Sequence, residues 1–135
     1  MNIADLAHFW GSDLVPSSNG DLFIATGTLA GEQRVLRRLL TNSQLVDPNG
    51  AVQASADATF HPNYGASLPR QVGMPVNVPQ TQATIVAQMG KEQAVSHLPI
   101  PVVQVTPIQD GINAVVAYND AASQTPVTLD FDVTK

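Results

Sequence analysis

The strongest constraint on the fold lies in the C-terminal third of the chain, where three β-rich runs follow one another with short polar connections. The runs cover residues 102–105, 112–118 and 126–133. Their valine, isoleucine and aromatic side chains favour extended structure, and connections this short join antiparallel neighbours. The sequence therefore predicts a three-stranded antiparallel meander.

The last run alternates between apolar and polar side chains, which predicts one buried and one solvated face. Helices must then cover the buried face. An outer strand of a meander also has one unpaired edge, which can accept a strand from another chain. We expect the joining edge either at this run or at the opposite edge, near residues 102–105. The run consists of Pro126, Val127, Thr128, Leu129, Asp130, Phe131, Asp132 and Val133.

Residues 28–40 have the pattern of an amphipathic helix, with Thr28 as a suitable N-cap. Five aliphatic residues fall within one arc of about 140°, and Arg34, Arg37 and Arg38 fall on the opposite arc. This arginine ridge has three interpretations: a solvated helix face, a docking surface for an acidic partner, or a contact with nucleic acid. The aliphatic residues are Leu29, Val35, Leu36, Leu39 and Leu40.

The other elements are weaker in pattern. We expect a short amphipathic helix at residues 3–7, a short strand at 21–25, and a second helix at 80–96 that Gly90 weakens. Residues 42–60 form a polar loop with room for a hairpin. The fold class predicted is α+β: a single domain in which two main helices pack on a small, mainly antiparallel sheet.

The length of 135 residues suits one domain, which we divide into a lead-in at residues 1–20 and a folded unit at residues 21–135. Only 13% of residues are charged, about half the usual share, which is typical of a subunit packed among neighbours. The net charge of −5 argues against general binding to nucleic acid. With no apolar run near the ~20 residues that span a bilayer and no signal-peptide pattern, we expect synthesis in the cytoplasm and no membrane anchor.

Residues that could carry catalysis or bind metal are scattered. His8, His61 and His97 have no metal-ligand spacing, and no cysteine is present. No serine lies in a nucleophile-elbow motif. Glu32 and Glu92 are the two glutamates, and strand alternation alone explains the paired aspartates of the last run. We therefore predict no catalytic site, no metal site and no cofactor.

Two stretches of the chain resemble a known family through their order. GEQRVLRRLLTN, at residues 31–42, precedes HPNYGASLPRQVG, at residues 61–73. This order is similar to that of the contractile-tail sheath-initiator, or baseplate wedge, family of phages, part of which carries a lysozyme label. The family pairs a P-x-[FY]-G-x-x-L segment with a second helix, an acidic motif and a C-terminal meander. The residues that carry the resemblance are His61, Pro62, Tyr64, Gly65, Leu68 and Glu92.

The chain departs from the family at two places. Many members have Glu-Pro-Arg after the second helix, whereas Glu92 here is followed by Gln93 and Ala94. The arginine of the family motif therefore has no counterpart at this position. The loop at residues 42–61 is also longer than in typical relatives.

The resemblance implies a structural, non-enzymatic subunit of the virion that forms a sixfold ring at the top of the tail baseplate and is assembled in the host cytoplasm. Its implied partners are the tail sheath protein, baseplate wedge proteins, and tube or hub neighbours, with neither nucleic acid nor membrane among them. Strand exchange with the subunit would start the first sheath ring. The alternatives are a tube or completion protein of the tail, a peptidoglycan hydrolase, and a free-standing binding module.

Overall fold

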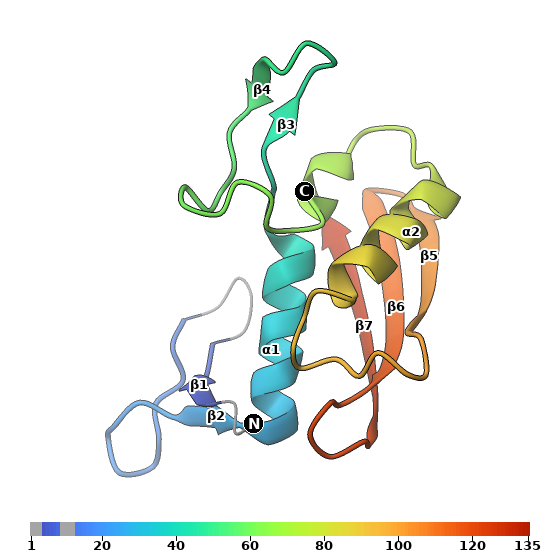
Figure 1. Ribbon diagram of the computed structural model, residues 1–135. Helices are drawn as coiled ribbons and strands as arrows, with labels where there is room; N and C mark the ends of the chain where they lie inside the picture. The colour runs from blue at the N-terminus through green and yellow to red at the C-terminus, as the bar shows by residue number, and fades with distance from the viewer. Residues whose placement is uncertain (1–3, 9–12) are drawn as a thin grey trace.

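The computed structural model describes residues 4–8 and 13–135 and confirms the α+β fold class. Over these residues, two α-helices and three small antiparallel sheets form a single domain (Figure 1). The predicted C-terminal meander is present, with strand order β5-β6-β7. The elements are β1 (Ala4–Leu6), β2 (Ile24–Thr26), α1 (Gly27–Leu40), β3 (Leu45–Val46), β4 (Val52–Ala54), the 3₁₀ helix η1 (Leu68–Gln71), α2 (Val78–Met89), β5 (Val102–Ile108), β6 (Gly111–Asn119) and β7 (Pro126–Thr134).

The N-terminal segment forms strands, so the helix expected at residues 3–7 is wrong for its described part. β1 pairs antiparallel with β2, with Asp5 opposite Ala25. Bridges at His8–Leu14 and Pro16–Leu22 add the segment at residues 14–16, which lies between β1 and β2 in the sequence. Local periodicity missed the strand because its partner is distant in the sequence. The predicted boundary at residue 20 falls in the turn between Pro16 and Leu22. The described part of the lead-in is therefore hydrogen-bonded directly to the segment that follows it.

Helix α1 begins earlier than predicted. Thr26, rather than Thr28, has the extended backbone of an N-cap residue. The predicted apolar face is present, because Val35, Leu39 and Leu40 are buried in the main core. The helix ends where Thr41 returns to extended backbone.

Helix α2 covers residues 78–89 and stops well short of the predicted end at residue 96. Its N-cap is Asn77, whose side chain accepts a hydrogen bond of 3.2 Å from the backbone N–H of Gln80. Gly90 follows the last helical residue, and glycine is a poor helix former. The chain then turns, and the backbone N–H of Glu92 donates a hydrogen bond of 3.0 Å to the backbone oxygen of Met89.

Replacing Asn77 by alanine should lower the free energy of unfolding by about 1 kcal/mol, because it removes the side-chain acceptor at the start of α2. Urea denaturation monitored by circular dichroism measures this change. Asn77→Asp is the matched control, since it keeps an acceptor and should stay within about 0.5 kcal/mol of the parent. Equal stability of all three proteins would show that the cap contributes nothing.

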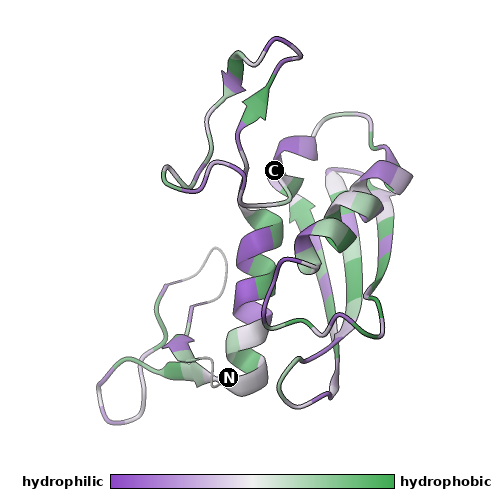
Figure 2. Ribbon diagram, in the orientation of Figure 1, coloured by the Kyte–Doolittle hydropathy of each residue, from purple (hydrophilic) through white to green (hydrophobic). Residues whose placement is uncertain are grey.

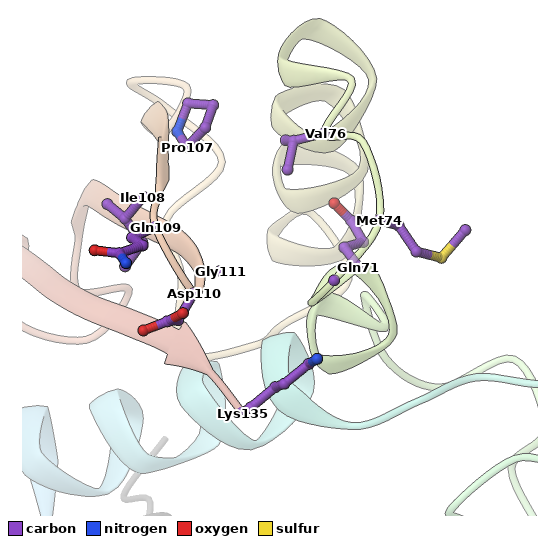
Figure 3. A pocket seen from close by; sticks show the side chains of 10 residues that line it. Gln71, Met74, Val76, Pro107, Ile108, Gln109, Asp110, Gly111 and Lys135 are labelled. Carbon is purple, nitrogen blue, oxygen red and sulfur yellow. The ribbon is translucent and has the colours of Figure 1, made fainter.

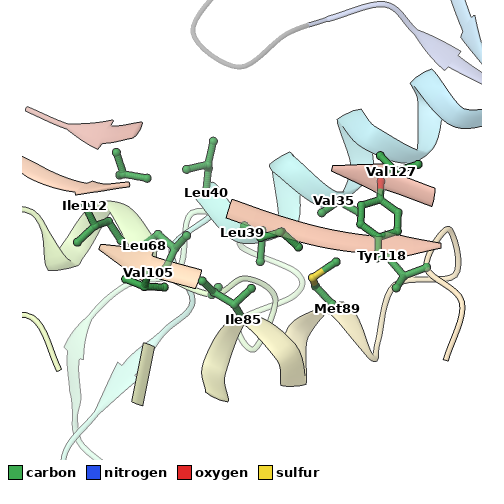
Figure 4. Packing of buried hydrophobic residues seen from close by; sticks show 14 residues of the cluster. Val35, Leu39, Leu40, Leu68, Ile85, Met89, Val105, Ile112, Tyr118 and Val127 are labelled. Atoms are coloured by element: carbon green, nitrogen blue, oxygen red, sulfur yellow. The ribbon is translucent and has the colours of Figure 1, made fainter. Parts of the chain in front are cut away.

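One face of the C-terminal sheet packs against both helices and forms the main core. Figure 4 shows Ile85 and Met89 of α2 and Leu39 of α1 lying against the strands. Val105, Ile112 and other alternate residues of the strands complete this layer. A fully buried aliphatic side chain contributes about 1.5–3 kcal/mol relative to an exposed one, so this single layer fixes the sheet on the helices.

Candidate assembly surfaces

Strand β7 presents a long edge without a partner. Its nine residues pair with β6 over their whole length. On its other side, no backbone group of residues 126–134 has a backbone hydrogen bond to any residue that the structure describes. Unpaired N–H and C=O groups in a row are a template for an added strand. Figure 1 shows β7 at the margin of the sheet next to α1.

Strand β5 forms the opposite margin, which is less open. The side chain of Gln82 in α2 donates a hydrogen bond of 3.3 Å to the backbone oxygen of Val103. Pro107 has no N–H to donate. Of the two predicted joining edges, β7 therefore offers the longer uninterrupted run of backbone groups.

The two faces of β7 differ as the alternation predicted. Val127 and Val133 are buried on the helix-covered face, whereas Thr128, Asp130 and Asp132 are exposed on the other. The side-chain amide nitrogen of Asn113 in β6 lies 2.8 Å from one carboxylate oxygen of each aspartate. The aspartates are thus fixed on the solvated face, beside the open edge.

The predicted ridge of three arginines is not free. The side chain of Glu92 is only 2% exposed. Its Oε1 lies 2.9 Å from Nε of Arg34, and its Oε2 lies 3.1 Å from Nε of Arg38. The Arg38 contact is a hydrogen bond. The Arg34 contact is ionic, because no donor is aligned with Oε1 despite the short distance. Both arginines are therefore paired within this chain, which corrects the interpretation of a ridge that is solvated throughout.

Arg37 is the exposed member of the three, with 45% of its side chain accessible. It pairs with Asp5 of β1, with 2.9 Å between Nη2 and Oδ2. The hydrogen bond from Arg37 lowers the pKa of Asp5. The pair ties the N-terminal hairpin to α1, and whether Arg37 also meets a partner protein stays a prediction.

The residues of the family-like segment gather around Arg38. The ring of Tyr64 lies over the Arg38 guanidinium, with its centroid at 4.3 Å. Leu68 is fully buried in the core. His61 and Pro62 are exposed and line a shallow pocket next to Arg38. The sequence pattern alone did not predict that this segment would meet Glu92 through Arg38.

Gly65 makes the closest backbone approach in this segment. Its φ angle is +115°, and a Cβ atom built on it would lie 2.1 Å from the backbone oxygen of Thr41. The backbone N–H groups of Ala66 and Ser67 donate to the oxygens of Arg38 and Thr41, each at 3.0 Å. Glycine is thus required to dock the segment on the end of α1.

A second pocket, of about 380 Å³, lies between residues 71–76 and the β5–β6 turn. Figure 3 shows the side chain of Lys135 extending from the end of β7 toward the loop that carries Gln71. Asp110 lines the other wall. The lining combines opposite charges with apolar side chains and has no arrangement that favours one ligand chemistry.

Two β-hairpins project from opposite ends of α1, on the side away from the C-terminal sheet (Figure 1). Figure 2 shows hydrophobic segments on both arms, β1/β2 and β3/β4. An exposed apolar surface of this kind is typical of an interaction site. The exposed large apolar residues of the arms are Leu6, Leu14, Leu22, Phe23, Ile24, Leu45, Val46 and Val52.

The described residues contain no cluster of three or more histidine, aspartate and glutamate side chains suited to a metal ion. Among these residues, no helix has the length and apolar character to cross a membrane. Searches of protein-family models, curated proteins and solved structures found no match to this chain.

Proposed function

We propose that this chain is a structural baseplate subunit of a phage-type contractile tail, and that it starts sheath assembly by accepting a strand from the first sheath ring. The observation that carries the proposal is the unpaired edge of β7. The phage-tail setting comes from the resemblance of residues 31–42 and 61–73, in that order, to the sheath-initiator family. The proposed partners are the tail sheath protein, baseplate wedge proteins, and tube or hub neighbours in a sixfold ring of the virion.

Strand addition at β7 explains how such a subunit would template a polymer. Backbone hydrogen bonds along the edge would provide affinity for any extended segment. The alternation of apolar and polar side chains would fix the register, because a shift of one residue exchanges the two faces. The first sheath ring would then form on an existing edge and avoid nucleation in solution.

The exposed arms support a subunit that is surrounded by other proteins. The arms β1/β2 and β3/β4 project away from the sheet and carry exposed apolar side chains, which contacts with neighbouring proteins would bury. We assign these arms to the wedge and tube or hub neighbours. The low share of charged residues, 13%, agrees with an extensively covered surface.

The proposal includes no catalytic role. Glu92 is buried and paired with two arginines, whereas a glycosidase acid needs access to its glycan and a partner carboxylate at a defined separation. Peptidoglycan turnover should therefore be at background for the purified chain and unchanged in Glu32→Gln. Turnover that Glu32→Gln abolishes would favour the hydrolase alternative.

Hydrogen exchange of the β7 amides tests the strand-addition step. In the isolated subunit, amides of residues 127–133 should alternate between slow exchange, where they face β6, and fast exchange, where they face the open edge. Addition of the sheath protein of the same tail should slow the fast set by roughly a hundredfold or more. A complex in which the fast set remains fast would contradict pairing at this edge.

A pair of proline variants provides the matched control. Thr128 and Leu129 are adjacent, so one amide faces β6 and the other faces the open edge. Proline at the outward position should leave the fold intact and abolish sheath binding, whereas proline at the inward position should destabilise the sheet. Sheath binding by a folded variant with the outward proline would overturn the mechanism.

A further inference from the structure

The shallow pocket beside the ionic cluster concentrates positive charge in an acidic protein. It has a volume of about 360 Å³ and lies between α1, the end of α2 and the loop at residues 60–64. Two permanent cations, Arg38 and Lys91, and the titratable His61 line it, and none of its lining residues is acidic. The whole chain has six lysines and arginines and a net charge of −5, so this grouping is local.

The buried cluster behind the pocket carries excess positive charge. One carboxylate, that of Glu92, is shared by the guanidinium groups of Arg34 and Arg38. Arg34 is 31% exposed, so water solvates much of its charge, whereas Arg38 is only 14% exposed. An arginine that is largely withdrawn from water and shares its counter-ion is stabilised by a second anion.

Arg38 also has donors left for such an anion. A guanidinium has five N–H groups. Among the described residues, one bonds to Glu92 at 3.1 Å and one reaches the side-chain oxygen of Gln88 at 3.4 Å, a long contact. Three N–H groups remain without a hydrogen-bond partner there. Since Arg38 lines the pocket, an acceptor placed in the pocket lies next to this side chain.

Two aromatic side chains at the rim of the pocket indicate that its occupant also has an apolar part. Phe60 is 91% exposed, and Tyr64 covers one face of Arg38. Backbone hydrogen bonds fix the loop, from Tyr64 to His61 at 3.0 Å and from Gln44 to Pro62 at 2.7 Å. An exposed aromatic side chain on the rim favours an occupant that has an apolar side chain next to its anionic group.

We propose that this pocket binds an acidic segment of a partner protein, with a carboxylate on Arg38 and Lys91 and a neighbouring apolar side chain on Phe60. The site is separate from the β7 edge and does not depend on the sheath proposal. A carboxylate matches the excess charge of the cluster, and an extended peptide can cover the exposed aromatic ring. The net charge of −5 disfavours nucleic acid as the occupant.

The test is an NMR titration of the ¹⁵N-labelled full chain with two blocked peptides, acetyl-Asp-Phe-Asp-amide and acetyl-Asn-Phe-Asn-amide. The acidic peptide should shift the amides of residues 60, 61, 63, 64 and 91 and bind in the millimolar range, while the neutral peptide should bind at least about fivefold more weakly. Equal binding of both peptides, or shifts confined to other residues, would overturn the proposal. Inorganic phosphate that binds more tightly than the acidic peptide would overturn it in favour of a phosphate site.

Variants at exposed positions keep the test independent of folding. Lys91→Glu should weaken the acidic peptide by about fivefold, and Phe60→Ser by about threefold because the apolar contact is lost. Lys135→Glu makes the same change of charge outside the pocket and should leave binding unchanged. An equal loss in Lys135→Glu and Lys91→Glu would show that overall charge, rather than this pocket, governs the interaction.

Discussion

Replacement of Glu92 by glutamine is expected to lower the free energy of unfolding by about 3 kcal/mol or more. The substitution keeps the shape of the side chain but removes the one negative charge between Arg34 and Arg38. Arg38 is only 14% exposed, so it cannot recover its hydration without a rearrangement of the loop that contacts it. Removal of one member of a buried ion pair lowers the free energy of unfolding by more than the pair contributes, because the remaining charge is buried without a partner.

Chemical denaturation of Glu92→Gln and of the control Asp110→Asn measures this cost. Asp110 is an exposed turn carboxylate, so its neutralisation should change stability by no more than about 0.5 kcal/mol. Arg38→Met should cost less in the Glu92→Gln background than in the parent, because the two residues are energetically coupled. Parent-like stability of Glu92→Gln would show that the cluster is not a structural centre.

Gly65→Ala is expected to destabilise the fold by more than about 3 kcal/mol. The added methyl group would lie 2.1 Å from the backbone oxygen of Thr41, and the φ angle of +115° is strained for alanine. Relief requires the segment to move away from the end of α1, which breaks the hydrogen bonds from Ala66 and Ser67.

Gly50→Ala separates the two causes of this effect. Gly50 also has a positive φ angle, +84°, but a Cβ atom there meets nothing within 4 Å. Its replacement should cost about 1 kcal/mol from backbone strain alone. Thermal and urea denaturation of both variants give the difference. Similar losses in the two proteins would show that contact with Thr41 is unimportant.

Elements with strong local patterns were the ones predictable from sequence. The C-terminal strands and the apolar face of α1 follow from alternation and helical periodicity, which act within a few residues. The end of α2 was misplaced because Gly90 was expected to weaken the helix, whereas the helix ends there. The strand expected at residues 21–25 overlaps β2, whereas β1 was missed because it is stabilised by β2, which lies far from it in the sequence.

The arginines show a second limit. A helical wheel separated Arg34, Arg37 and Arg38 from the apolar face, as the pattern indicated. It could not reveal that Glu92, after a different helix, would be buried between two of them. One signal was present in the sequence: Glu92 precedes the apolar pair Ala94 and Val95, both of which are buried. A glutamate beside core residues requires a cationic partner.

The amide of Asn113 holds two carboxylates on the open face of the sheet, and this arrangement affects which strands the edge can receive. Two copies of the subunit that met antiparallel through β7 would set Asp130 of each opposite Asp130 of the other in the register that pairs the whole strand, and opposite Asp132 in the register centred on Phe131. Like charges opposite each other on neighbouring strands repel. The β7 edge is therefore disfavoured for pairing with a second copy of this chain. It remains available to a strand of another protein that has neutral or basic side chains at those positions.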